Sequence, residues 1–406
     1  MSRLKIFISA YACEPGLGSE IGVGWHWVLE MSRYFELWVL TRESNRGSIE
    51  PWIKEHPEYS GIHFLYFDLP KWARFWKKGL RGVRTYYNLW QWFTNRIVRR
   101  TMRRNDIKIF HHLTYGNALW GVSRYGSRQK FIWGPIGGLE TIPEDFSRHY
   151  ARKSRLIESI RRLSVKLSCQ SPALKRRARR ADLILCKTAL TRDLLPADAQ
   201  KHAVLFTDVA TDTSVSSLSP TATHTGLCCL AVGRLDAWRG FDLAIEAVAR
   251  AVRTYPEIRL GIMGKGVDHE RLEALARRLG ISENVIFLGA VPPEDYRRLM
   301  AEADVVLNPA LKEGAVTVSF DAMALGKPLI ALDTTGYTRY FKPDFSIVIP
   351  RRDRDAVISD FADAILTLTD SDLRRKMGDK ARHEAGNISW RHHGEEIRDI
   401  ILDAFN

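Results

Sequence analysis

The 406-residue sequence has few cysteines and no long apolar run. No apolar stretch approaches the ~20 residues that a membrane-spanning helix needs. The apolar residues near the start, Leu4–Ile8, are too few for a signal peptide and predict a strand. The five cysteines are scattered and not in metal-ligand spacing: Cys13, Cys169, Cys186, Cys228 and Cys229. This pattern excludes a disulfide framework and favours the reducing cytoplasm.

Positive charge is abundant but unevenly distributed. The chain has 61 Lys+Arg against 47 Asp+Glu, a net charge of +14. Residues 71–104 contain 11 Lys+Arg, no acid and eight aromatic residues, whereas residues 148–180 contain 12 Lys+Arg and one acid, Glu158. Without these two basic stretches the chain would be net negative.

A basic segment interleaved with Trp and Tyr is typical of an anionic membrane interface. We therefore expect residues 71–104 to contact an anionic membrane surface. The alternative is that part of this segment packs on its own domain and part is solvated. For residues 148–180 the alternative is a solvated helix. Aromatic and basic surfaces also bind single-stranded nucleic acid, but no recognised nucleic-acid module is present, so no nucleic acid is expected.

Short β-rich runs alternate with amphipathic helical stretches, a pattern that predicts parallel sheets covered by helices on both faces. The length exceeds what one hydrophobic core supports, so two doubly wound, Rossmann-like α/β domains are expected. In the first half the expected strands are 4–9, 35–40, 62–67, 107–113, 131–134, 183–187 and 203–206. In the second half they are 227–232, 258–263, 285–288, 305–308, 328–332 and 346–349.

The expected domain bounds follow from this alternation. Residues 1–208 form an N-terminal domain and residues 226–388 a C-terminal domain, joined by a Ser/Thr-rich linker at 209–225. A C-terminal helix occupies 389–406, with Ile397, Ile400, Ile401 and Ala404 on one face. Two such domains in tandem suggest a ligand beyond the carboxyl ends of the strands.

Three segments could carry chemistry. Gly16–Trp25, after the first strand, is glycine-rich and precedes a helix whose free N–H groups could face an anion, although its spacing is not that of a dinucleotide fingerprint. Gly233–Gly240 places two guanidiniums, Arg234 and Arg239, where both could reach one diphosphate. Glu313–Gly326 supplies two carboxylates, Glu313 and Asp321. Taken singly, the first segment is as compatible with a tight strand-to-helix connection, and the second with a solvated basic turn. The pair of acids by itself favours an interpretation without a ligand.

Together the motifs resemble those of family 4 glycosyltransferases of the GT-B fold. The resemblance rests on Gly233-Arg234-Leu235, Gly240–Ala247, Gly264-Lys265-Gly266 and the acids Glu313 and Asp321. Seven residues separate the two acids, and Ala-Met-Ala-Leu-Gly-Lys-Pro follows the second. Tyr11–Pro15, Gly22–Trp25 and Trp133–Gly138 are similar to a bacterial subgroup associated with surface polysaccharide and other glycoconjugate synthesis. The resemblance covers nearly the whole chain and is strongest from Leu227 to Asp333.

The resemblance implies a donor site for a nucleotide-diphosphate sugar in the C-terminal domain. Arg234 matches the arginine on the diphosphate, and Arg239 stands where a lysine is usual. Glu313 matches the acid that contacts the donor sugar. Asp321 replaces the usual second glutamate, which holds the ribose, and its shorter side chain reduces its reach. Residues near the helix start are implied as donor contacts as well: Gly314, Ala315, Val316 and Thr317.

In the N-terminal domain, Gly22 matches a loop glycine near the diphosphate. His112 occupies the place of a histidine near the reacting sugar, with His111 the less favoured choice. The catalytic set expected from the resemblance is therefore His112, Glu313, Arg234 and Arg239.

The implied reaction is a hexosyl-type transfer with retention of anomeric configuration to a lipid-linked or glycan acceptor. In the front-face mechanism proposed for this family, the departing phosphate oxygen takes the acceptor proton, so no protein base is needed. Guanidiniums replace a metal ion, and no cofactor is expected beyond the co-substrate. Asp353–Asp355 and Asp370–Asp372 are expected to be helix caps. Such an enzyme would be cytoplasmic and peripheral at the inner face of the plasma membrane. A sugar-nucleotide epimerase or a non-catalytic binding protein remains the alternative.

Overall fold

The computed structural model describes residues 3–77, 82–212, 225–312, 317–334 and 336–405. The described residues form two compact units, each built around one parallel sheet. All thirteen strands expected from the sequence are present, with ends that differ by no more than two residues. The β-rich runs were predictable because most of their residues are buried under helices and are therefore apolar.

The first unit comprises residues 1–139, 165–208 and the C-terminal helix from Trp390 onward. Its described strands are β1 (Lys5–Ser9), β2 (Glu36–Arg42), β3 (His63–Phe67), β4 (Ile109–His112), β5 (Lys130–Ile136), β6 (Leu183–Cys186) and β7 (Ala203–Leu205). They pair in the order β3-β2-β1-β4-β5-β6-β7. All pairs are parallel, and Ser9 of β1 lies opposite both Leu40 of β2 and His112 of β4.

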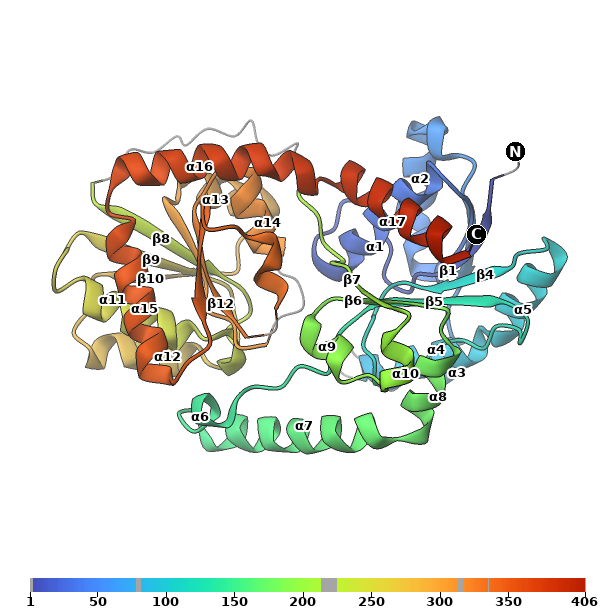
Figure 1. The fold of residues 1–406 in the computed structure, drawn as a ribbon, viewed down its shortest axis with the longest axis horizontal. Coiled ribbons are helices and arrows are strands. Elements are labelled where there is room, and N and C mark those ends of the chain that lie inside the picture. Colours follow the sequence, from blue (N-terminus) through green and yellow to red (C-terminus); the bar gives the residue numbers. More distant parts are fainter. Residues whose placement is uncertain (1–2, 78–81, 213–224, 313–316, 335, 406) are drawn as a thin grey trace. The chain divides into compact units, whose positions relative to one another are not determined.

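Helices cover both faces of this sheet (Figure 1). The described α-helices are α1 (Ser19–Ser32), α2 (Arg46–Glu55), α3 (Lys71–Arg74), α4 (Val83–Phe93), α5 (Asn95–Arg104), α8 (Pro172–Arg180), α9 (Ala189–Asp193), α10 (Ala197–Gln200) and α17 (Trp390–Phe405). One core holds Phe7 and Phe110 with side chains of α4 and α8. The other holds Ile6 and Ile8 with side chains of α1 and α17. Alternate residues of each strand thus serve opposite faces.

The second unit comprises Glu140–Ser164 and Val209–Ser389. Its described strands are β8 (Leu227–Val232), β9 (Ile258–Met263), β10 (Val285–Gly289), β11 (Val305–Asn308), β12 (Leu329–Asp333) and β13 (Ser346–Pro350), in the order β10-β9-β8-β11-β12-β13. The described helices are α6 (Glu144–Ser147), α7 (Arg152–Gln170, to Ser164 in this unit), α11 (Phe241–Ala251), α12 (His269–Arg278), α13 (Pro293–Glu302), α14 (Thr317–Ala324), α15 (Arg354–Thr367) and α16 (Ser371–Ala385).

Residues 140–164 differ from the expected domain bounds. They precede the linker in sequence, yet contacts assign them to the second unit. The physical reason is burial: Ile142, Phe146 and Tyr150 are in the hydrophobic core of that unit. A segment from the first half of the chain therefore completes the core of the second unit.

The C-terminal helix α17 begins at Trp390, one residue after the expected start, and belongs to the first unit. Ile397 and Ile401 are buried in its core, and His393 stacks edge-on against Trp27 with ring centroids 4.8 Å apart. Ala404, expected on the same apolar face, is instead exposed. These contacts confirm the crossover helix of the predicted fold.

Candidate functional site

In the second unit, the strand order reverses between β8 and β11. At such a switch point the loops that follow the two strands diverge and leave room for a ligand beyond their carboxyl ends. Gly233–Gly240 follows β8, and Lys312 and the start of α14 follow β11. Two of the three segments singled out in the sequence therefore meet at the switch point of one sheet.

The Gly-Arg-Leu turn packs backbone to backbone against the turn that contains Gly264 and Gly266. The Gly233 N–H donates to the Met263 carbonyl at 2.9 Å, and the Leu235 N–H donates to the Lys265 carbonyl at 3.0 Å. Gly264 has a φ of +145°, and a Cβ there would lie 1.9 Å from the Gly233 carbonyl oxygen. Only glycine fits such an approach, so this pair of turns fixes the position of Arg234.

The two arginines expected on the diphosphate both lie at this turn. Arg234 is 67% exposed and forms an ion pair with Asp236 at 2.8 Å. Arg239 ends a short 3-10 turn (Ala237–Arg239), and its guanidinium stacks on the Trp238 ring 4.4 Å from the centroid. A Cβ on Gly233 would lie 3.2 Å from Arg239 Nε, so the Arg239 side chain lies against the backbone that carries Arg234. The structure thus brings these two cations to one edge of the sheet.

A third cation, Lys312, joins this group. Its ammonium lies 5.4 Å from the centroid of the Trp238 ring and forms an ion pair with Glu158 at 2.6 Å. The side chains of Lys312 and Glu158 are only 10% and 9% exposed. Burial lowers the pKa of Lys312, and the Glu158 carboxylate opposes that shift. Glu158 therefore anchors the cation that directly precedes Glu313.

Asp321 lies inside α14, as expected, and one of its oxygens has a partner within the protein. The Tyr296 hydroxyl donates to Asp321 Oδ2 at 2.5 Å. Burial raises the pKa of Asp321 to about 6, although the Tyr296 hydrogen bond opposes the shift. Thr317 begins α14. Glu313, Gly314, Ala315 and Val316 lie outside the described residues, so their expected donor contacts stay predictions.

The first unit has an equivalent switch point between β1 and β4. Here the expected glycine loop is shorter than predicted, because α1 begins at Ser19 and includes Gly22 and Gly24. A Cβ on Gly22 would lie 2.0 Å from the Leu17 carbonyl oxygen, and one on Gly24 would lie 2.1 Å from that of Ala12. The glycines let the first turns of α1 pack on the preceding loop. The helix start was not predicted because glycine is typical of loops.

His112 ends β4 at this switch point and is buried. Its Nε2 lies 2.9 Å from the Tyr87 hydroxyl, and its Nδ1 has no hydrogen-bond partner among the described residues. Burial lowers the pKa of His112 to about 3, so the ring is neutral at physiological pH. His111 Nε2 instead lies 2.7 Å from the Gly134 carbonyl oxygen. The two histidines therefore have different partners, and the role expected of His112 stays a prediction.

The eight aromatic residues of 71–104 differ in exposure: three are buried, three are exposed, and Trp76 and Phe93 are partly buried against the first core. Tyr86, Tyr87 and Trp90 are buried in the first core, so for these three the alternative of packing inside their own domain applies. They are buried because α4 is amphipathic and presents them to the sheet. Trp72, Phe75 and Trp92 are exposed by 72%, 78% and 61%, respectively. These three side chains remain available to a partner.

The two Asp-x-Asp triplets begin helices, as expected. Asp353 caps α15 by accepting from the Ala356 N–H at 3.0 Å, and Asp370 caps α16 by accepting from the N–H groups of Asp372 and Leu373. Across the part of the chain that the structure describes, no group of three His, Cys, Asp or Glu could hold a metal ion. No helix in that part is long and apolar enough to cross a membrane.

Sequence reasoning missed Glu158, Lys312, Trp238 and Tyr296. The signal for Glu158 was present, since it is the one acid in residues 148–180. Its partner Lys312 is 154 positions away, and no local pattern predicts that contact. Tyr296, on α13, meets Asp321 only because both helices flank the second sheet.

Known proteins are similar to this chain in the sequence of one segment and in fold. Residues 221–384 match the family model of glycosyl transferases group 1, a segment that includes Arg234, Arg239, Glu313 and Asp321. Solved structures with the same fold include a glycosyltransferase from Rickettsia africae ESF-5, with a TM-score of 0.63, 12% identity and full coverage of both chains. Another is Anabaena Alr3699/HepE in complex with UDP, with a TM-score of 0.62, 14% identity and coverage of 98% and 100%. The chain therefore has the GT-B glycosyltransferase fold.

Curated relatives match over a shorter range. A D-inositol 3-phosphate glycosyltransferase from Corynebacterium jeikeium (strain K411) is 33% identical over 178 residues, which are 42% of this chain and 42% of the relative. One from Nocardia farcinica (strain IFM 10152) is 33% identical over 174 residues, or 41% and 38% of the two chains. The chain thus matches about two fifths of the length of these relatives, and this segment is similar to glycosyl transferases group 1.

Proposed function

We propose that the protein is a glycosyltransferase that transfers a sugar from a nucleotide-diphosphate donor to an acceptor hydroxyl. The observation that carries the proposal is the meeting of Arg234, Arg239 and Lys312 at the switch point of the second sheet, inside the segment that matches glycosyl transferases group 1. Similar folds include a protein solved with UDP-glucose, which supports a nucleotide-sugar donor. The donor would bind beyond the carboxyl ends of β8 and β11.

In this proposal the barrier is departure of the nucleoside diphosphate while the sugar becomes oxocarbenium-like. Arg234 is exposed and can rotate from Asp236 onto a phosphate, and Arg239 is held in place by the Trp238 ring. Positioned guanidiniums stabilise the charge that develops on the leaving group, and such electrostatic effects are worth about 3 kcal/mol or more. Glu313 would orient the donor sugar, and Asp321 would accept from a ribose hydroxyl through its second oxygen.

We further propose that transfer proceeds with retention and without a metal ion. The departing phosphate oxygen would accept the acceptor proton, so no protein base is required. His112 fits this scheme as a neutral group near the reacting sugar, because burial keeps its ring from taking up the second proton that would charge it at neutral pH. Its role would be to hydrogen-bond the sugar rather than to transfer a proton.

For the acceptor we propose a lipid-linked saccharide or another glycoconjugate precursor of polysaccharide biosynthesis. Exposed Trp72, Phe75 and Trp92 lie in a segment without acids and would rest at the headgroup depth of an anionic membrane. The enzyme would then be cytoplasmic and peripheral at the inner face of the plasma membrane. The curated relatives are named as D-inositol 3-phosphate glycosyltransferases, so a phosphorylated polyol is a second acceptor to test beside the lipid-linked saccharide.

The direct test of transfer is release of nucleoside diphosphate from a nucleotide sugar, followed by NMR of the product's anomeric proton. We expect release only when an acceptor is added, and a product with the anomeric configuration of the donor. An epimerase would instead convert the sugar or release nucleoside diphosphate without any acceptor. Inversion in the product would refute the retaining mechanism but leave the transferase assignment intact.

A further inference from the structure

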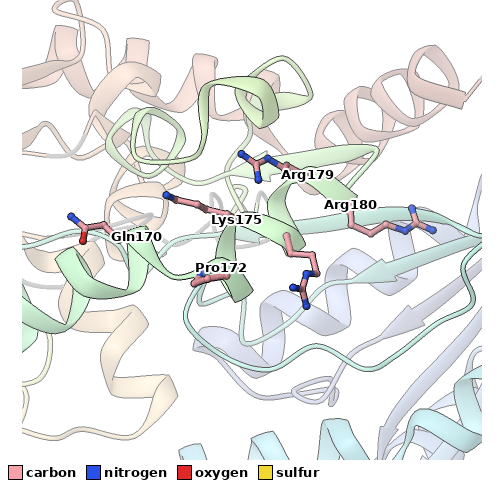
Figure 2. Close-up of a pocket in the computed structure, with 6 residues that line it drawn as sticks. Gln170, Pro172, Lys175, Arg179 and Arg180 are labelled. Atoms are coloured by element: carbon pink, nitrogen blue, oxygen red, sulfur yellow. The ribbon is translucent and has the colours of Figure 1, made fainter.

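The first unit contains a basic pocket that the proposed reaction does not use. It has a volume of about 480 Å³, within the range of small-molecule sites. Four of its six lining residues are cationic and none is acidic: Gln170, Pro172, Lys175, Arg176, Arg179 and Arg180. Figure 2 shows the labelled side chains extending from α8 and from the end of α7. We call this the α8 pocket.

The cations gather because of the helical period. Residues 175 and 179 are four positions apart, as are 176 and 180, so these two adjacent pairs of side chains lie on one side of α8. The opposite side carries Leu174 and Ala178, which are buried in the first core. Arg177 points inward as well and donates to the Ala118 carbonyl at 3.3 Å. The four cationic side chains therefore lie on the side of α8 away from the core, and the opposite side packs against that core.

Two of the cations are held in place by the protein. Arg179 forms an ion pair with Asp198 at 2.6 Å. Arg180 donates to the carbonyls of Ser127 and Gln129 at 2.8 and 2.9 Å. Such contacts restrict the guanidiniums before any ligand arrives, which lowers the entropy cost of binding.

The other two cations lack such partners. Lys175 is half-buried and Arg176 is exposed, and neither side chain has a hydrogen-bond or ion-pair partner among the residues that the structure describes. Like charges one turn apart on a helix repel, so this arrangement destabilises α8 unless an anion binds. The two unpaired cations next to two fixed guanidiniums match an anion with several oxygens.

We propose that the α8 pocket binds the phosphate or diphosphate group of a ligand other than the sugar donor. Guanidinium and ammonium groups that line one pocket can both contact phosphate oxygens. The ligand could be soluble, or its phosphate could be a lipid headgroup, since Leu167, one turn before Gln170, is 58% exposed. The lining residues of the α8 pocket belong to the first unit, whereas Arg234 and Arg239 belong to the second.

The test compares two charge-reversal variants of the full chain. K175E/R176E changes the pocket. R253E/R278E changes two exposed arginines of the second unit that have no side-chain partner among the described residues, so it is matched in charge. Both are made in an R234A/R239A background, which removes the proposed donor contacts, and are titrated calorimetrically with inorganic diphosphate. A second series measures co-sedimentation with phosphatidylcholine vesicles, with and without phosphatidylglycerol.

We expect K175E/R176E, but not R253E/R278E, to weaken binding about tenfold or more in at least one series. If K175E/R176E loses diphosphate binding, the ligand is a soluble phosphate compound. If it loses binding only to vesicles with phosphatidylglycerol, the ligand is a lipid headgroup. Equal effects of both variants, or no effect of either, would overturn the proposal. If charge reversal lowers the melting temperature, K175Q/R176Q replaces it under the same criteria. Failure of R234A/R239A to alter donor binding would count against the proposed function alone.

Discussion

Asp321, a residue of the proposed donor site, has the environment with the clearest measurable consequence. Its pKa is raised to about 6 by burial, above the value of an unfolded chain. Between about pH 4 and 6 the native state therefore holds a proton that the unfolded state has released. The stability that this proton contributes is present below pH 4 and is lost as the pH rises through 6.

We expect D321N to abolish this part of the pH dependence of the unfolding free energy. Relative to D321N, the wild type should lose on the order of 2–3 kcal/mol of unfolding free energy between pH 4 and 6.5. Urea unfolding at several pH values measures it. The control is D353N, at an exposed helix cap where asparagine caps as well as aspartate, and it should keep the wild-type slope. A wild-type slope in D321N would show that Asp321 titrates normally.

Lys312 and Glu158 are the second residue pair with a sharp consequence. Both side chains are about nine-tenths buried, and Glu158 Oε2 has no hydrogen-bond partner among the described residues. Removing one member of a buried pair leaves the other charge uncompensated. The pair therefore couples residues 140–164 to the cations of the proposed donor site.

We predict that E158A lowers the unfolding free energy by about 3–5 kcal/mol, because it strands the Lys312 ammonium. It should also weaken donor binding by releasing Lys312 from the Trp238 ring. The matched control is E144A, which breaks the exposed pair with Arg162 and should cost at most about 1 kcal/mol. Comparable losses in E158A and E144A would contradict the buried-pair account.

At the scale of elements, the position of α1 depends on two glycines in its first turns. Gly24 is close to both Ala12 and Thr114, so the helix start touches the loops after β1 and β4. These are the two loops at the switch point of the first sheet. The glycines thus act through packing, whether or not a phosphate binds there.

We expect G24A to destabilise the first unit by about 2 kcal/mol or more, because its Cβ would meet backbone that cannot move away. Thermal unfolding measures the loss. G18A is the control, since a Cβ there meets no atom within 4 Å and Gly18 has a negative φ. A G24A protein as stable as G18A would refute the close packing of α1.

At the scale of the whole molecule, the sequence predicted the sheets better than the site. Each strand is buried under helices, so local runs such as Val305–Asn308 were sufficient to find it. The arginines were found because Gly233 and Gly240 mark tight turns at the end of a strand. Residues 140–164 were misplaced because their core contacts, through Phe146 and Tyr150, are far away in sequence.

The site contacts made by Glu158, Trp238 and Tyr296 could not be predicted for the same reason. An ion pair or hydrogen bond between distant segments leaves no periodic signal, and it becomes visible only when the helices are placed on the sheet. The Asp321–Tyr296 contact joins positions 25 residues apart on two helices. What the sequence does reveal is which chemical groups are available.

The central claim is that the second unit binds a nucleotide-diphosphate sugar through Arg234 and Arg239. The most direct measurement is a thermal-shift screen of nucleotide sugars against the wild type and R234A/R239A. The account predicts that at least one nucleotide sugar stabilises the wild type, by roughly 2.7 kcal/mol at 100 times its dissociation constant. The same compound should leave R234A/R239A nearly unchanged. Stabilisation by none of the nucleotide sugars, or equal stabilisation of both proteins, would contradict the claim.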